Sequence, residues 1–429
     1  MTAPALAMPR RRGTCPGLSA PMPTGDGLLV RLLPVGTITL ENFIELGAAA
    51  RRHGNGTVEI TSRGSVQIRG LSAASAPRFA AAIAALGIAA ADGIPVLSNP
   101  LAGLAPDELI DAGALAAEVR HALARSALAQ RLSAKVSVTI DGGGALGLDH
   151  LVADACLRAE VFDAEIVVGV SLGGSASSFA LGAIAPPDVA AAIVRLLEVL
   201  SQHGRDARAR DVVVKHGTAA FHAAIADLFV DRSAKHSPRP SRDPIGAHRL
   251  RDGSVAYGLG LAFGHADAAS LQRLAEAAAA AGAAGLRTAP GRALLILGLA
   301  PESLPSFVGA AEALGFIVRG NDPRRQVIAC AGAPVCAAAA IAARAMAPQI
   351  ADAIAPHGDG ALKIHISGCA KGCAHPAPAA LTVVGTPSGC ALVADGTTHG
   401  ALFKIVAADE LPAAIAAFAR DRKNEARHV

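Results

Sequence analysis

Four cysteines in the last quarter of the chain are the residues whose spacing restricts its chemistry most. Cys330 and Cys336 form a C-x5-C motif, and Cys369 and Cys373 form a C-x3-C motif after a gap of 32 residues. Four thiolates that meet at one site need a cation or an iron–sulfur core to offset their charge. The spacers consist mostly of small residues, and Gly368 lets a backbone amide approach a sulfur. The pattern therefore predicts a metal or iron–sulfur centre.

Two other uses of these cysteines stay open at this point. A structural zinc site usually has spacers of about two to four residues, which the C-x5-C motif does not match. Two disulfides would suit a secreted chain, but no secretory signal is evident and 7 cysteines are an odd number. We expect the remaining three to be buried bystanders: Cys15, Cys156 and Cys390.

Composition favours a soluble, cytoplasmic protein with an aliphatic core. Hydrophobic residues make up 52% of the 429 residues and the mean hydropathy is +0.41, but no apolar run reaches membrane length. With no Trp, one Tyr and 11 Phe, the chain offers few aromatic rings for stacking nucleobases. The net charge of +4 is mild. We therefore expect neither a nucleic acid nor a membrane as partner.

The cysteines lie in the second copy of an internal repeat. Gly54 recurs as Gly282 and Lys135 recurs as Lys363, each 228 residues later. The offset holds through helix-like and strand-like segments alike, so a whole unit is duplicated. The join is predicted at 232–249, where the string SPRPSRDP resembles a linker.

Each copy is predicted to run through the same order of elements. The segments are a strand from Leu28, a helix at 40–50, a strand at 57–69, a strand from Lys135 and a closing helix at 187–203. In the second copy the equivalent segments are a strand from Val255, a helix at 269–281, a strand at 286–297, a strand from Lys363 and a closing helix at 407–420. This order predicts an α+β fold with pseudo-twofold symmetry, and not a long run of parallel βα units.

Strand periodicity predicts a polar face that only the first copy has at 57–69. There, Arg63, Ser65, Gln67 and Arg69 share one side, whereas the equivalent positions 291, 293, 295 and 297 are apolar. Such a face is either a solvated strand surface or the wall of an anion site. We expect the second copy to hold the metal, and the first to supply most of the basic wall opposite.

The chain resembles the sulfite/nitrite reductase superfamily, whose cluster motif is C-x5-C and C-x3-C, and within it the precorrin-3B synthase family. The strings that carry the resemblance are GLSAPMPTGDGL at 17–28, TSRGSVQIRGL at 61–71 and SGCAKGCAHP at 367–376, in a similarity from about 12 to 420. The resemblance implies a duplicated reductase-like fold. Its units would be ferredoxin-like halves at 12–90 and 250–315, mixed α/β domains at 91–231 and 316–422, and the linker at 232–249.

Site residues follow from the resemblance one by one. It implies that Cys330, Cys336, Cys369 and Cys373 bind a 4Fe–4S cluster. It also implies that a tetrapyrrole is bound by Arg31, Arg63, Gln67, Arg69 and Lys135. Two positions depart from the reductase pattern, because Ser137 replaces a second lysine and residues 92–94 lack a third arginine. Sulfite reduction is correspondingly less expected.

The resemblance implies an O2-dependent monooxygenase of aerobic cobalamin biosynthesis. Such an enzyme hydroxylates precorrin-3A at C-20 with γ-lactone formation, using electrons from an NADH-linked reductase or a ferredoxin-like donor. Lys135, Asp141 and His365 are the candidate catalytic residues; the last two are candidate ligands of a mononuclear non-haem iron, with His150 and His375 as weaker candidates. A sirohaem-dependent nitrite or sulfite reductase and a non-catalytic iron–sulfur electron carrier remain as alternatives.

Overall fold

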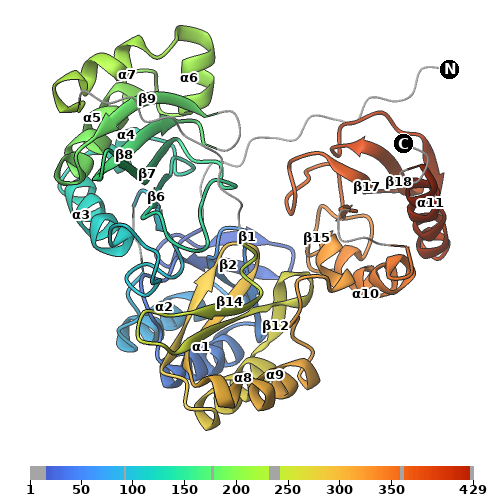
Figure 1. The fold of residues 1–429 in the computed structure, drawn as a ribbon. Coiled ribbons are helices and arrows are strands. Elements are labelled where there is room, and N and C mark those ends of the chain that lie inside the picture. Colours follow the sequence, from blue (N-terminus) through green and yellow to red (C-terminus); the bar gives the residue numbers. More distant parts are fainter. Residues whose placement is uncertain (1–15, 91–92, 175–177, 231–241, 358–361, 426–429) are drawn as a thin grey trace.

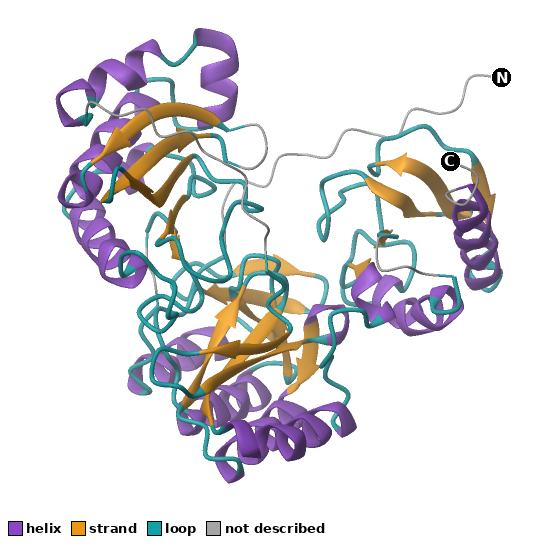
Figure 2. Cartoon of the chain, viewed as in Figure 1, coloured by secondary structure: helices purple, strands orange, loops and turns teal. Residues whose placement is uncertain are grey.

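Two outer lobes flank a central body in the computed structural model of the chain (Figure 1). The structure describes residues 16–90, 93–174, 178–230, 242–357 and 362–425. Each outer lobe comes from one stretch of sequence, whereas the central body takes elements from both halves of the chain. In every lobe, helices pack against a β-sheet (Figure 2).

Two β-sheets form the central body, with strand orders β1-β2-β4-β3-β12 and β10-β11-β14-β13. Because β12 comes from the second half and pairs antiparallel with β3, it joins the two halves. The first sheet contains β1 (Met22–Thr24), β2 (Gly27–Leu32), β3 (Thr57–Ile60), β4 (Val66–Leu71) and β12 (His265–Asp267). The second contains β10 (Gly246–Arg249), β11 (Val255–Gly260), β13 (Gly285–Ala289) and β14 (Ala293–Leu299). The helices of this body are α1 (Leu40–His53), α2 (Ser75–Ala85), α8 (Ala268–Ala280) and α9 (Leu304–Ala313).

The two halves share one hydrophobic core. Helix α1 begins after Thr39, whose hydroxyl accepts a hydrogen bond from the amide of Asn42 at 3.1 Å. Its buried Phe43 belongs to the same cluster as Leu271 of α8 and Phe307 of α9, which come from the second half. Burial of each such side chain contributes about 2 kcal/mol. We therefore expect neither half to keep this core alone.

The outer lobes repeat one topology, in which the first three strands are parallel and the last two antiparallel. The N-terminal lobe contains β5 (Val96–Ser98), β6 (Val138–Asp141), β7 (Ala155–Phe162), β8 (Glu165–Leu172), β9 (Phe179–Ile184), α3 (Ala112–Ala124), α4 (Leu128–Arg131), α5 (Val189–Ser201), α6 (Ala209–His216) and α7 (Ala219–Ala224). The C-terminal lobe contains β15 (Val327–Ala329), β16 (Ile364–Ser367), β17 (Ala379–Thr386), β18 (Gly389–Gly396), β19 (Lys404–Val406), α10 (Ala343–Ile354) and α11 (Leu411–Glu425).

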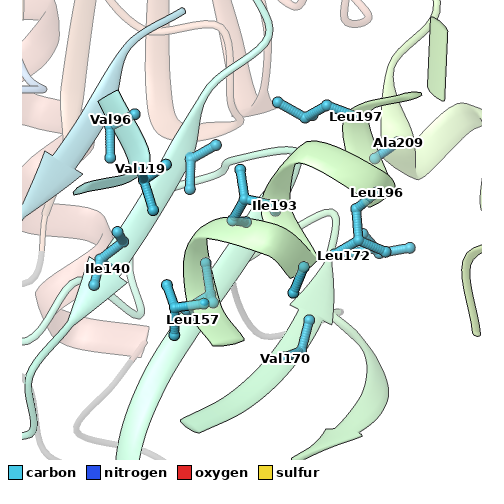
Figure 3. Packing of buried hydrophobic residues seen from close by; sticks show 14 of the residues in the cluster. Val96, Val119, Ile140, Leu157, Val170, Leu172, Ile193, Leu196, Leu197 and Ala209 are labelled. Atoms are coloured by element: carbon cyan, nitrogen blue, oxygen red, sulfur yellow. The ribbon is translucent and has the colours of Figure 1, made fainter. Parts of the chain in front are cut away.

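Aliphatic side chains build the core of the N-terminal lobe (Figure 3). The buried residues of α5 include Ile193, Leu196 and Leu200, whose spacing puts them on one helix face. They share a cluster with Leu157 of β7 and Val170 of β8. The aliphatic core predicted from composition is thus confirmed for this lobe.

The duplication and the α+β class are confirmed, whereas two predicted strands, 57–69 and 286–297, are wrong. Strand β2 begins at Gly27 and β11 at Val255, which keeps the offset of 228 residues. Residues 57–69 are a hairpin, because the chain turns between β3 and β4 at Gly64, whose φ of +83° suits glycine. Residues 286–297 divide in the same way into β13 and β14. Arg63 therefore lies in a turn and not on a strand.

The duplicated units are interlocked in space. Of the predicted linker at 232–249, residues 232–241 lie outside the described residues, and Gly246–Arg249 form β10. A separate apolar cluster joins Leu101 and Leu146 of the N-terminal lobe to Ile245 and Ala256 of the second half. Within the described ranges, no helix has the length and apolar character needed to cross a membrane.

Candidate active site

A cavity of about 770 Å³ is lined by residues of the central body and of the C-terminal lobe. From the first half it is lined by residues of β1 to β4 and of the β3–β4 turn. From the second half it is lined by the segments that follow β15 and β16. These segments contain all of the predicted cluster ligands: Cys330, Cys336, Cys369 and Cys373.

Neighbouring parallel strands bring the two cysteine motifs together. Cys330 follows β15 directly and Cys369 follows β16, and β15 and β16 pair in parallel, so their carboxyl ends meet. The amide of Gly368 donates a hydrogen bond to Sγ of Cys330 at 3.1 Å. A Cβ on Gly368 would lie 2.6 Å from Cβ of Ala339, so only glycine fits between the two loops. This confirms the amide-to-sulfur approach that the small spacer residues indicate.

The second cysteine loop is held by side-chain hydrogen bonds to its backbone. The hydroxyl of Ser367 donates to the carbonyl of Cys369 at 2.7 Å, and that of Thr398 donates to the carbonyl of Ala370 at 2.8 Å. Gly372 has a φ of +59°, a left-handed conformation that a residue with a side chain rarely adopts. The turn between the cysteines is therefore fixed from both sides.

All four cysteines of the two motifs line the same cavity, but they are not grouped around one point. Each thiolate of a four-cysteine iron–sulfur cluster binds its own iron, so the sulfurs surround the cluster without converging on one point. Among the described residues, no group of three or more His, Cys, Asp or Glu side chains is placed to hold one metal ion. Cys156, Cys330, Cys336, Cys369 and Cys390 are free thiols.

Cys156 and Cys390 do not line the cavity, and Cys15 is not among the described residues. Cys390 is fully buried in the core of the C-terminal lobe, as predicted. Cys156, on β7, is largely buried, and its burial raises the pKa of its thiol.

Both halves supply the cationic wall, which corrects the prediction that it comes mainly from the first. The cavity is lined by Arg31, Arg63 and Arg69 of the first half and by Arg292, Arg344 and Lys371 of the second. Arg292 lies in the β13–β14 turn, and Arg344 in the first turn of α10. Strand alternation cannot detect cations that project from a turn and a helix.

A chain of polar contacts connects the two walls. Nε of Arg31 donates to Oε1 of Gln67 at 2.9 Å, and Nε2 of Gln67 donates to Oε2 of Glu59 at 2.7 Å. The other oxygen of Glu59 forms an ion pair with Arg344. Glu59 lies on β3, and the whole residue is 7% exposed. Glu59 thus positions one arginine through Gln67 and binds another directly.

Arg69 and Arg63 are both held by partners outside the cavity. Nη2 of Arg69 pairs with Oδ1 of Asp26 at 3.0 Å. Arg63 reaches the N-terminal lobe, where it donates to the carbonyl of Val152 at 2.8 Å and to Oγ of Ser137 at 2.9 Å. It also lines a second cavity of about 410 Å³. The serine that replaces the expected second lysine therefore fixes the arginine that faces the cavity.

The three candidate catalytic residues are not brought together. Lys135 is exposed and absent from the cavity lining. Asp141, in the N-terminal lobe, accepts hydrogen bonds from the amides of Gly143 at 2.9 Å and Leu148 at 3.0 Å, so its carboxylate organises a turn. His365 is fully buried on β16 in the C-terminal lobe. The described residues thus offer no joint iron site for Asp141 and His365.

The two weaker iron candidates also lie apart from each other. His150 follows Asp149 in the N-terminal lobe, and burial lowers its pKa. The ring of His375 lies 5.7 Å from that of His365, edge to face. Burial lowers the pKa of His365 to about 4, with His375 and Arg292 adding to the shift.

Sequence reasoning missed several residues of this site. Glu59 lies opposite Gln67 in the β3–β4 pair, so recognising the hairpin would have placed both on the same wall. Asp26 was visible only as part of a family string. Arg292 and Arg344 gave no periodic signal.

Comparisons with known proteins point to one class of enzyme. The nitrite/sulfite reductase ferredoxin-like half domain family matches residues 20–86. Precorrin-3B synthase from Sinorhizobium sp is 42% identical over 392 residues, which cover 91% of this chain and 84% of that protein. Sulfite reductase (ferredoxin) 2 from Mycolicibacterium paratuberculosis is 25% identical over 372 residues, covering 79% and 66%. The solved structure of Mycobacterium tuberculosis NirA protein matches with a TM-score of 0.74 at 20% identity, covering 91% of this chain and 79% of that one.

The fold and the comparisons together define an oxidoreductase of the sulfite/nitrite reductase superfamily. Within that class the level of identity is decisive, because it is much higher to one member than to the reductases. The chain belongs to the precorrin-3B synthase family.

Proposed function

We propose that this protein is an O2-dependent monooxygenase that converts precorrin-3A to precorrin-3B, hydroxylating C-20 and closing a γ-lactone in aerobic cobalamin biosynthesis. The observation that carries the proposal is the 42% identity to a precorrin-3B synthase over 91% of the chain. The cavity supports it independently, because cations from both halves and four cysteines line the same space.

The proposed cofactor is a 4Fe–4S cluster held by Cys330, Cys336, Cys369 and Cys373. The donor set is all thiol, and the amide of Gly368 already points at the sulfur of Cys330. Burial raises the pKa of the Cys330 thiol, an effect that this amide opposes. When bound, the cluster would pass single electrons from an external donor toward the cavity.

The proposed role of the arginines is to bind and orient the acid side chains of the substrate. Arg31 and Arg63 are each fixed by hydrogen bonds to a neutral side chain, Gln67 and Ser137. A guanidinium held in this way can bind a carboxylate with little loss of rotamer freedom. Because Arg69 is paired with Asp26, we expect it to shape the wall more than to bind an acid group.

The size of the cavity supports a large ligand. Its volume of about 770 Å³ lies in the upper part of the range for cofactor and ligand sites, roughly 300–1,000 Å³. A polycarboxylate macrocycle fits a cationic cavity better than a small dianion does, because its charges are spread around its rim. A sulfite site would need a second lysine to add positive charge. Ser137 stands at that position here and accepts a hydrogen bond from Arg63.

One reaction tests the proposal against the sirohaem-dependent reductase alternative. The protein is purified without air and supplied with precorrin-3A, a reductant and isotopically labelled dioxygen, and the product is examined by mass spectrometry. We expect a hydroxylactone that carries a single labelled oxygen atom, from protein that contains no sirohaem. Resident sirohaem with turnover of nitrite or sulfite, and no labelled product, would favour the reductase instead.

A further inference from the structure

Arg292 occupies a backbone position that normally suits glycine. It ends the turn between β13 and β14 with a φ of +64°, in the left-handed region. The first-half residue at the repeat offset of 228 is Gly64, whose φ is +83°. A residue with a side chain is strained in this conformation. A strained arginine in the cavity lining raises the question of what its guanidinium does there.

A second glycine, Gly264, leaves room for the side chain of Arg292 to reach the loop that carries Cys373. A Cβ on Gly264 would lie 2.6 Å from Cδ of Arg292, so the aliphatic part of the arginine passes where a side chain is missing. At the end of this path, Nη2 donates to the carbonyl of Ala374 at 3.2 Å, directly beside Cys373. Arg292 also lines the cavity, so it borders both the loop and the space for a ligand.

The surroundings do not neutralise Arg292. Among the described residues, the contact to Ala374 is the one hydrogen bond of its guanidinium, and no carboxylate is paired with it. Glu59 is the carboxylate that interacts electrostatically with Arg292. Its two oxygens, however, already bind Gln67 and Arg344. Burial lowers the pKa of Arg292. His365 nearby adds no negative charge.

Arg63 shows the contrast. It is the arginine of the β3–β4 turn, and it reaches the N-terminal lobe, where two of its nitrogens donate to Val152 and Ser137. A desolvated cation without an anion is costly, and a carboxylate from a ligand in the cavity would remove that cost.

We propose that Arg292 binds a carboxylate of the tetrapyrrole and so determines which edge of the macrocycle faces the loop that carries Cys369 and Cys373. The inference rests on the proposed function for the identity of the ligand, and it adds a substrate-orienting residue from the second half. It also gives a reason for the strained backbone, because this turn reaches both the cavity and Ala374.

The test uses uroporphyrin, a stable tetrapyrrole with an acetate and a propionate on every pyrrole, as the probe. Arg292→Gly removes the guanidinium and leaves a residue that the backbone prefers, so the fold should be as stable as before or more stable. We expect uroporphyrin to bind about 10- to 100-fold more weakly to this variant, measured by the change in uroporphyrin fluorescence as holoprotein is added. Arg292→Lys should recover part of the loss.

The matched control is Arg319→Gly, which removes an arginine whose side chain is 70% exposed and paired with Glu312. It should change uroporphyrin binding by less than about twofold. Unchanged binding in Arg292→Gly, with cysteine-bound iron and circular dichroism as in the wild type, would overturn the role of Arg292 and leave the proposed function standing. If the wild-type protein binds no uroporphyrin and converts no precorrin-3A, both proposals fail.

Discussion

Removing either partner of the Glu59–Arg344 ion pair should lower the free energy of unfolding of the whole protein, in addition to changing the cavity wall. The pair joins β3 of the first half to α10 of the C-terminal lobe, and its side chains are 9% and 19% exposed. Arg344→Met would leave a buried carboxylate whose remaining partner is the neutral amide of Gln67. Breaking a fully buried pair from one side costs about 3–5 kcal/mol. Because the pair borders a cavity that admits water, we expect about 2–3 kcal/mol.

A double-mutant cycle isolates the interaction itself. The free energy of unfolding is measured by urea titration with circular dichroism for Glu59→Gln, Arg344→Met and the double variant. We expect a coupling energy of about 1.5–3 kcal/mol, since each single change leaves its partner unsatisfied and the double change does not.

An exposed pair provides the comparison. Glu312 and Arg319 have side chains that are 48% and 70% exposed, so the same cycle there should give a coupling of about 0.5 kcal/mol or less. An equally small coupling between Glu59 and Arg344 would mean that this pair does not hold the two parts of the molecule together.

Three further predictions concern acid stability, the glycine between the cysteine loops and the cysteines themselves. Burial and neighbouring Arg344 lower the pKa of His265 from 6.5 to about 4, so the unfolded chain binds a proton that the folded protein does not. The free energy of unfolding should therefore fall by up to about 3 kcal/mol as the pH drops from 6.5 to 4, and His265→Gln should flatten that slope in urea titrations. Gly368→Ala should lower the iron and sulfide content of the purified protein, because the new Cβ meets Ala339; normal content would contradict the tight fit. Cys369→Ser should abolish both the iron–sulfur absorption and the activity, while Cys156→Ser should leave both intact.

The duplication could be predicted from the sequence because its offset survives in glycines and strand residues alike. Gly54 and Gly282 mark equivalent positions after α1 and α8, and the cysteine spacing alone indicated a thiolate-held centre. Such features are local, so single-sequence reasoning can find them. The hairpin at 57–69 was missed because alternation continues across the turn at Gly64, and a two-residue period does not show where a strand reverses.

Contacts between the two halves could not be predicted from periodicity. Glu59 and Arg344 are 285 positions apart in the chain, and Arg292 lies in a turn that the pattern indicated as apolar. Asp141 lies at the repeat offset of 228 from Cys369, but its carboxylate accepts hydrogen bonds from amides in the N-terminal lobe. Equivalence in a repeat predicts position within a copy; it does not predict that two copies have the same chemistry.

The central proposal is a redox centre held by second-half sulfurs next to a tetrapyrrole cavity, and one spectrum tests it directly. Protein purified without air is assayed for iron, zinc and acid-labile sulfide, then reduced and examined by electron paramagnetic resonance with and without uroporphyrin. We predict iron and sulfide in equal amounts and a reduced-state signal that shifts when the tetrapyrrole binds. Zinc in place of iron, or an iron–sulfur signal that saturating uroporphyrin leaves unchanged, would contradict the account.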